Sequence, residues 1–210
     1  MPVLNRYDLL QRMLDTIDHR IHRLVLIDNG DALDKLKFPG AVQHVSYIPL
    51  PANLGVAGSW NLGIKVLPHC DRWFIGSNDI MFAPGDLAKL EQARVDELTV
   101  CEAFPHWQVF CLGEEVVRTV GLFDESYFPA YFEDNDYERR VKHHGFGIRQ
   151  LQLGVTHDNS STLRANRKYA ERNSATFRSN RLRFMEKQQE FDYGSGYWDL
   201  TRRRENDWNR

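Results

Sequence analysis

The feature that most constrains the fold is a regular alternation of short apolar segments and helix-like segments in the first part of the chain. The apolar segments at 24–27, 42–48 and 73–75 are each followed by turn-forming or polar residues. Between them, residues 10–17 and 56–67 carry apolar side chains at the spacing of a helix that packs one face against a core. This alternation predicts an α/β fold with a parallel sheet, and such sheets bind ligands beyond the carboxyl ends of their strands.

Size and composition suit a single globular domain with an appendage, since the chain has 210 residues. Its 27 basic and 29 acidic residues give a net charge of −2, so the overall charge neither favours nor excludes a nucleic-acid partner. Cys70, Cys101 and Cys111 are too few and too irregularly spaced for a disulfide framework or a zinc site, and we expect free, mostly buried thiols. The sequence has neither an apolar run of membrane-spanning length nor a signal-peptide pattern, which predicts a cytoplasmic protein.

The middle of the chain is less regular but continues the mixed pattern. We expect strands at 100–101, 107–112 and 147–156, and helices at 114–120 and 133–144. Gly145 is a suitable stop for the second of these helices.

The segment that follows residue 162 differs in character from the rest. Eight basic residues lie between Arg164 and Lys187, against only two acidic ones. Apolar residues recur there at intervals of seven, at Leu163, Ala170, Phe177, Phe184 and Phe191. This narrow stripe can dock a helix on the body of the protein but does not predict a coiled coil. We therefore divide the chain into an α/β domain at 1–162 and a basic C-terminal helix and tail at 163–210.

Acidic and aromatic side chains are concentrated between residues 121 and 139, where Glu133 and Asp134 open a predicted helix. Carboxylates at a helix start are favoured by the helix dipole, so simple capping is one interpretation. The other is a general base, because aromatic neighbours can desolvate a carboxylate and raise its affinity for a proton.

Two further positions are candidate metal ligands. Asp79 follows an apolar strand, and a carboxylate at that position can hold Mg²⁺ or Mn²⁺ beside phosphate oxygens. His157 ends the last predicted strand and would complete the site only if it lies close to Asp79. The alternatives are a turn-forming aspartate and a surface histidine.

The segment from Asn53 to Gly63 contains several glycines near a helix start, which permits close approach to a diphosphate. It matches neither the phosphate-loop nor the dinucleotide-binding pattern, and helix packing explains its glycines almost as well.

In their order along the chain, these pieces resemble glycosyltransferase family 2, whose members have the GT-A fold. The resemblance extends from residue 2 to about residue 162, and its motifs are Pro2-Val3-Leu4-Asn5-Arg6, Leu26-Ile27-Asp28-Asn29-Gly30, Asn53-Leu54-Gly55 with Asn61-Leu62-Gly63, Ser77-Asn78-Asp79, Gly121-Leu122-Phe123-Asp124-Glu125 and Tyr131-Phe132-Glu133-Asp134-Asn135-Asp136. The family's metal-binding motif often has a further carboxylate. Here Ser77 takes its first position and Asp79 is its single acid.

The resemblance implies a nucleoside-diphosphate-sugar donor, with a UDP-sugar as the expected form. Pro2, Leu4 and Asp28 would line the pocket for the nucleotide base, with Asp28 binding the base directly. Asn53 and Asn61 would shape the diphosphate and ribose side of the site.

The resemblance also implies a catalytic arrangement. Asn78 would help to bind the nucleotide sugar, while Asp79 and His157 would hold Mn²⁺ or Mg²⁺. Asp134 would be the general base that activates an acceptor hydroxyl, and Glu133 would position the base or the acceptor. The implied activity is an inverting hexosyl or pentosyl transfer.

Two alternatives to this interpretation remain at the sequence level. One is a catalytically weak GT-A module that binds a sugar nucleotide or a partner. The other is a nucleotidyltransferase, which would need a glycine-rich, lysine-bearing phosphate loop near the N-terminus that this sequence lacks. The acceptor is left open among a glycan, a lipid-linked sugar, a protein and modified DNA.

Overall fold

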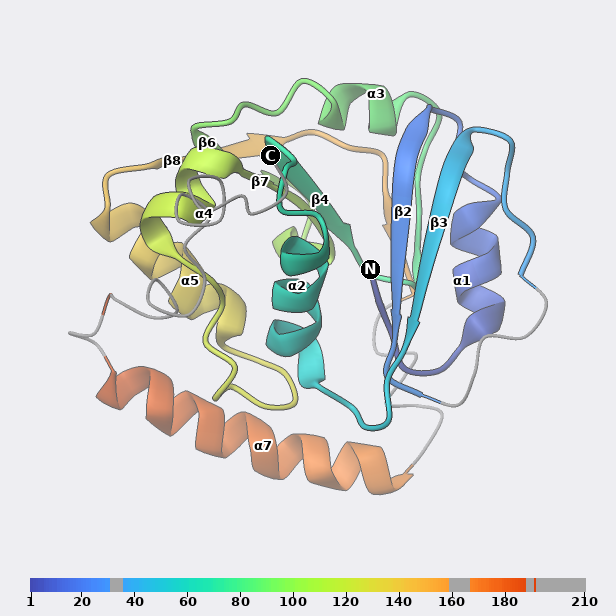
Figure 1. The fold of residues 1–210 in the computed structure, drawn as a ribbon. Coiled ribbons are helices and arrows are strands. Elements are labelled where there is room, and N and C mark those ends of the chain that lie inside the picture. The colour runs from blue at the N-terminus through green and yellow to red at the C-terminus, as the bar shows by residue number, and fades with distance from the viewer. Residues whose placement is uncertain (31–35, 159–166, 188–190, 192–210) are drawn as a thin grey trace, which may run out of the picture.

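The computed structural model describes residues 1–30, 36–158, 167–187 and 191. The N-terminal part is a three-stranded parallel sheet in the order β1 (Pro2–Val3), β2 (Ile21–Asp28) and β3 (Val42–Pro49). Helix α1 (Tyr7–Leu14) lies on one side of this sheet and α2 (Gly55–Val66) on the other (Figure 1). The predicted alternation of strands and helices is confirmed here.

A second sheet has the order β4-β7-β6-β8 and is mixed. Its strands are β4 (Arg72–Gly76), β6 (Glu97–Cys101), β7 (Val109–Gly113) and β8 (Gly147–Leu151). Strand β7 runs antiparallel to both β4 and β6, whereas β6 and β8 are parallel. The α/β class is as expected. The parallel strand pairs are divided between two sheets, since β1–β3 form the first and the β6–β8 pair belongs to the second.

The remaining short elements include two strands that pair with each other, β5 (Ile80–Met81) and β9 (Thr156–His157). The helices are α3 (Asp86–Leu90), α4 (Glu114–Val120) and α5 (Glu133–His143), with a 3-10 turn η1 at His106–Gln108. The strand predicted over 147–156 is wrong as a single element, because residues 152–155 separate β8 from β9. Asp86, which is fully buried, accepts a hydrogen bond from the Gly154 amide at 3.0 Å and holds the chain in this break.

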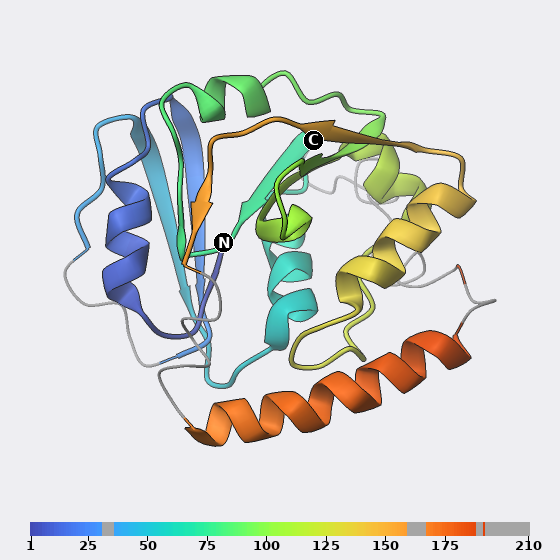
Figure 2. The same ribbon diagram turned by 180° about the vertical axis from the view of Figure 1, so that it is seen from behind.

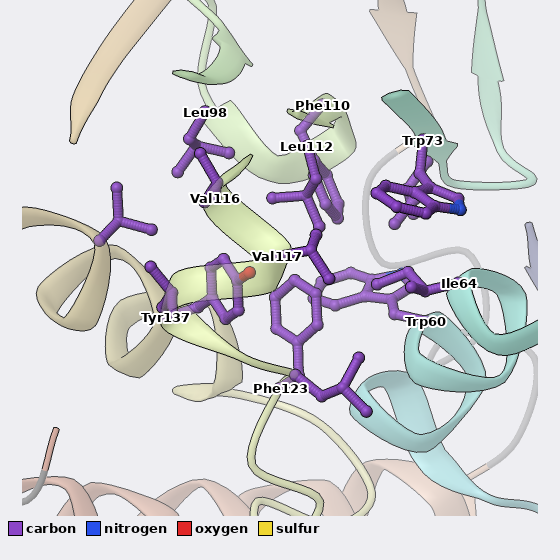
Figure 3. Close-up of a cluster of buried hydrophobic side chains, with 14 of the residues drawn as sticks. Trp60, Ile64, Trp73, Leu98, Phe110, Leu112, Val116, Val117, Phe123 and Tyr137 are labelled. Carbon is purple, nitrogen blue, oxygen red and sulfur yellow. The ribbon is translucent and has the colours of Figure 1, made fainter. Parts of the chain in front are cut away.

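An aromatic core joins α2, α4 and α5 to the second sheet (Figure 3). The Trp60 ring lies 4.9 Å from that of Phe110 and 4.8 Å from that of Phe123, and Phe123 stacks on Tyr137 at 4.1 Å. Burial of such rings is a large part of what stabilises a domain. Of the cysteines, Cys101 and Cys111 are buried and Cys70 half-buried, and all three are free thiols, as expected.

Helix α7 (Arg167–Glu186) runs along one edge of the molecule, beneath α2 and α5 in Figure 1 and in the reverse view of Figure 2. Phe177 and Phe184 contact Phe132 at 5.1 and 5.6 Å, and Phe191 stacks on His143 at 3.7 Å. These contacts confirm the docking stripe for the three phenylalanines. Leu163, Arg164 and the tail from residue 192 lie outside the described residues. Within the described part of the chain, no helix is long and apolar enough to cross a membrane.

Candidate active site

The carboxyl ends of β1 and β2 are adjacent, because Val3 pairs with Asp28. The side chain of Asn78, in the turn between β4 and β5, donates a hydrogen bond of 3.0 Å to the carbonyl of Asn5, just beyond β1. The turn that carries Asp79 is thereby tied to the end of the parallel sheet. This is the location that parallel α/β sheets commonly use for ligands.

Asp79 and His157 are brought together from opposite ends of the domain. Their strands pair at Ile80 and His157, and the Nε2 atom of His157 lies 3.0 Å from Oδ1 of Asp79. Only 15% of the His157 side chain and 11% of the Asp79 side chain are exposed. The Asp158 amide also donates to the Asp79 carbonyl at 2.9 Å, which fixes the turn.

Two buried polar atoms next to these residues have no hydrogen-bond partner among the described residues. They are Nδ1 of His157 and Oδ1 of Asn5. A buried polar atom normally has a hydrogen-bond partner, and exceptions are common at sites that bind water or an ion.

Arg6 is a further neighbour of this pair that the sequence did not predict. Its hydrogen bond to Asp8 and the carboxylates of Asp158 and Asp79 raise its pKa.

Asp28 is 1% exposed and ends β2, as predicted. Its carboxylate accepts hydrogen bonds from the hydroxyls of Tyr7 at 3.0 Å and Tyr47 at 2.7 Å, and from the Gly30 amide at 3.0 Å. Pro2 lies in β1 beside this strand end, and the Leu4 carbonyl packs against Gly30 so closely that a Cβ atom there would overlap it. Asp28 therefore stands at the centre of a preformed polar cluster rather than as an isolated acid.

The start of α2 is fixed by asparagines. The Asn29 side chain accepts a hydrogen bond from the Leu54 amide at 2.9 Å, and Asn53 accepts one from the Gly55 amide at 2.8 Å. The next amide, of Val56, donates to the carbonyl of Pro129 at 2.7 Å. These hydrogen bonds connect the end of β2 to the start of α2, and the start of α2 to the segment before α5.

Asn61 lies on α2 but is 1% exposed, and all its polar groups are used within the protein. Its Nδ2 donates to the Phe123 carbonyl at 2.9 Å and to Glu125 at 2.8 Å, and its Oδ1 accepts from the Phe123 amide at 2.9 Å. Asn61 therefore fixes the 123–125 segment against α2 and orients Glu125, whose side chain is exposed.

Glu133 and Asp134 begin α5 after two residues with left-handed backbone, Tyr131 at φ 78° and Phe132 at φ 71°. Such conformations cost about 1–3 kcal/mol each in non-glycine residues and occur mostly at functional sites. The strained turn brings Glu133 to 5% exposure, and its Oε2 atom has no hydrogen-bond partner among the described residues.

Burial dominates the electrostatics of this pair. It raises the pKa of Glu133 to about 8, and the neighbouring Asp134 adds to the shift. Burial also raises the pKa of Asp134, although the Asn135 amide, which donates to Oδ1 at 2.8 Å, opposes the change. Near neutral pH, Glu133 is therefore mostly a neutral acid that can donate a hydrogen bond, as the aromatic surroundings suggested.

A buried ion cluster behind this pair was not predicted. Asp124 and Asp136 are both fully buried, and the Nζ atom of Lys187 lies 2.8 Å from Asp124 and 3.2 Å from Asp136. Arg140, also fully buried, donates to Asp136 at 2.9 Å and to the carbonyls of Val120 and Leu122. The basic C-terminal segment is evident in the sequence, but nothing there predicts that Lys187 is buried.

Comparison with known proteins shows a fold similar to that of one solved structure and a short stretch of sequence similarity to another protein. No protein-family model matches the chain. Over 37 residues, which are 18% of this chain and 8% of the relative, it is 49% identical to a galactofuranosyl glycosyltransferase of Leishmania donovani. Among solved structures it is similar to a mannosyltransferase of Pyrobaculum calidifontis in complex with GDP-Man and Mn²⁺, with a TM-score of 0.56 and 15% identity over 72% of this chain and 53% of that one. The mixed α/β fold is thus shared with a glycosyltransferase, of which the chain spans about half the length.

Proposed function

We propose that the chain is an inverting glycosyltransferase of the family 2 type, which moves a sugar from a nucleoside diphosphate to an acceptor hydroxyl. The observation that carries the proposal is the meeting of Asp79 and His157, 78 positions apart, at 3.0 Å beside the end of the parallel sheet. The left-handed turn that presents Glu133 and Asp134 is the second support. The fold shared with a mannosyltransferase agrees with both.

The residues present fit a divalent ion such as Mn²⁺ or Mg²⁺. Asp79 and His157 would hold the ion, since a carboxylate oxygen and an imidazole nitrogen lie together there in a largely buried turn. The described residues contain no group of three or more histidine, cysteine or acidic side chains able to hold a metal. The donor diphosphate and water would therefore complete the coordination, and the ion would neutralise charge that develops on the leaving group.

The nucleotide would lie along the ends of β1 and β2, between Asp28 and the start of α2. Pro2, Leu4 and the cluster around Asp28 would face the base, with Tyr7 and Tyr47 fixing the carboxylate. Asn53 and Asn78 would approach the diphosphate, and Asn61 would act by holding Glu125 in place. We expect a UDP-sugar donor and would test GDP-mannose beside it, since the structural neighbour binds that compound.

In the transfer step, Asp134 would accept the proton of the acceptor hydroxyl. The acceptor oxygen would form a bond to the anomeric carbon while the bond from that carbon to the diphosphate oxygen breaks, leaving its electron pair on the nucleoside diphosphate. Attack from the face opposite the leaving group inverts the anomeric carbon. Glu133, protonated near neutral pH, would donate a hydrogen bond that orients the acceptor.

A donor screen tests this proposal. UDP-sugars and GDP-mannose are incubated with the protein and Mn²⁺, Mg²⁺ or EDTA, and release of the nucleoside diphosphate is measured with and without simple sugar acceptors. We expect release from one class of donor that requires the metal and is accelerated by an acceptor. Metal-independent binding of a sugar nucleotide with no turnover for any donor would contradict a transferase and favour a binding module.

A further inference from the structure

Helix α7 contacts the short segment that precedes the Glu133–Asp134 pair. The Nδ2 atom of Asn180, which is 5% exposed, donates hydrogen bonds to the carbonyls of Ala130 at 2.9 Å and Tyr131 at 3.2 Å. Phe177 of the same helix packs edge-on against Tyr131 at 5.3 Å. The helix therefore holds the backbone at the residue where the left-handed turn begins.

The residue that follows α7, Lys187, holds the first turn of α5. Lys187 is 6% exposed and bridges Asp124, in the segment before the turn, and Asp136, in the first turn of α5. With Arg140, the cluster has two buried carboxylates and two buried cations, and at its edge Arg139 pairs with Asp136 at 2.9 Å and Arg183 with Asp124 at 3.5 Å. Loss of Lys187 would remove the cation that bridges the two carboxylates, and Asp124 would keep the more exposed Arg183 as its cationic partner.

A left-handed conformation at two consecutive non-glycine residues persists only where the surroundings impose it. Asn180 binds the backbone where these residues begin, and Lys187 pairs with carboxylates on both sides of them in the sequence, Asp124 and Asp136. The Asn180 side chain binds the carbonyl of the first left-handed residue and that of the residue before it. The placement of the carboxylates that follow the turn therefore depends on α7.

We propose that Asn180 and Lys187 are positioning residues, through which α7 fixes Glu133 and Asp134 in the geometry needed for proton transfer. This inference rests on the proposed function of that pair. It assigns the basic C-terminal helix a role in catalysis rather than in binding the nucleotide, because residues 177–187 contact the 124–136 segment and α5.

Two substitutions test the proposal, each on the wild-type background of the full chain. Asn180→Leu keeps a similar volume but removes both hydrogen bonds, and Lys187→Met removes the buried charge. Arg181→Met is the matched control, because Arg181 is an exposed basic residue on the same helix. Lys187→Arg is the conservative variant, which restores a cation.

We expect kcat to fall by about 100-fold in Asn180→Leu and Lys187→Met, the size of effect that a small misplacement of catalytic groups produces. The donor KM and the affinity for nucleoside diphosphate with Mn²⁺ should stay at wild-type values. Lys187→Arg should recover most of kcat, and Arg181→Met should match the wild type. If Lys187→Met does not fold, Asn180→Leu alone decides the question.

Amide hydrogen exchange supplies a measurement that does not depend on turnover. Exchange at residues 131–135 should accelerate in Asn180→Leu while residues 137–141 of α5 keep wild-type protection. Folded variants with wild-type kcat and unchanged exchange would overturn the role of α7. A wild-type protein without transfer activity, but with the expected exchange difference, would instead count against the proposed function alone.

Discussion

The Asp79–His157 pair and the Glu133–Asp134 pair are constructed in opposite ways. The first joins residues far apart in sequence through a short antiparallel strand pair, and its side chains remain in hydrogen-bond contact. The second consists of adjacent residues on a left-handed turn, where burial raises the pKa of both carboxyls. This contrast agrees with the proposed roles, in which the first pair holds a cation and the second handles a proton.

Asp134→Asn tests the proton-handling region and has the largest expected effect. An amide cannot accept the acceptor's proton, so the transfer rate should fall by about 10²–10⁴-fold while donor binding is retained. Steady-state kinetics and a binding titration on the same preparation measure both quantities. Asp71→Asn, at an exposed carboxylate before β4, is the matched control. If Asp134→Asn turns over at the wild-type rate, the base has been misassigned.

His157→Ala tests the cation-binding region. Loss of a ligand should weaken Mn²⁺-dependent donor binding by about 100-fold. The chain offers a matched control in His19, whose Nε2 lies 3.1 Å from Glu91 in a more exposed pair. His19→Ala should leave metal dependence unchanged. If His19→Ala weakens Mn²⁺-dependent donor binding as much as His157→Ala does, the assignment of His157 as a metal ligand is wrong.

Glu133→Gln tests the buried neutral acid through the pH dependence of the free energy of unfolding rather than through the transfer rate. The side chain has a pKa of about 8 in the folded protein against 4.5 as its ordinary value, so between these pH values the folded state holds one more proton. Its contribution to stability is complete below pH 4.5 and is lost as the pH rises through 8, with a slope of about 1.4 kcal/mol per pH unit. Denaturant unfolding from pH 5 to 9 should show a shallower decline in Glu133→Gln. Asp134, whose pKa is also raised, will retain a share of the slope. A variant as pH-dependent as the wild type would contradict the buried neutral acid.

The sequence predicted the elements that depend on local periodicity. The helix predicted at 114–120 is present, and Asp79 and His157 lie together because β5, which follows Asp79, pairs with β9. The break between β8 and β9 could not be predicted, because it depends on Asp86, which reads locally as an ordinary acid in a first helical turn.

The support behind the acidic pair was missed for a related reason. A basic segment is usually a solvated helix face, and nothing local distinguishes Lys187 from the exposed Arg181. Likewise, Asn180 gains its meaning only from the two carbonyls that it reaches across the fold. Such contacts depend on where α7 docks. The seven-residue spacing of its apolar residues predicts that the helix docks, but not which residues it contacts.

The most direct test of the division between the two regions is the identity of the ligands around Mn²⁺. The protein is labelled with ¹⁵N-histidine, and electron spin-echo measurements are made on Mn²⁺ with UDP or GDP added. We expect a nitrogen coupling that survives in His19→Ala and in Asp134→Asn but disappears in His157→Ala. Nucleotide-dependent binding of Mn²⁺ with no histidine coupling, or a coupling that persists without His157, would show that His157 is not a metal ligand.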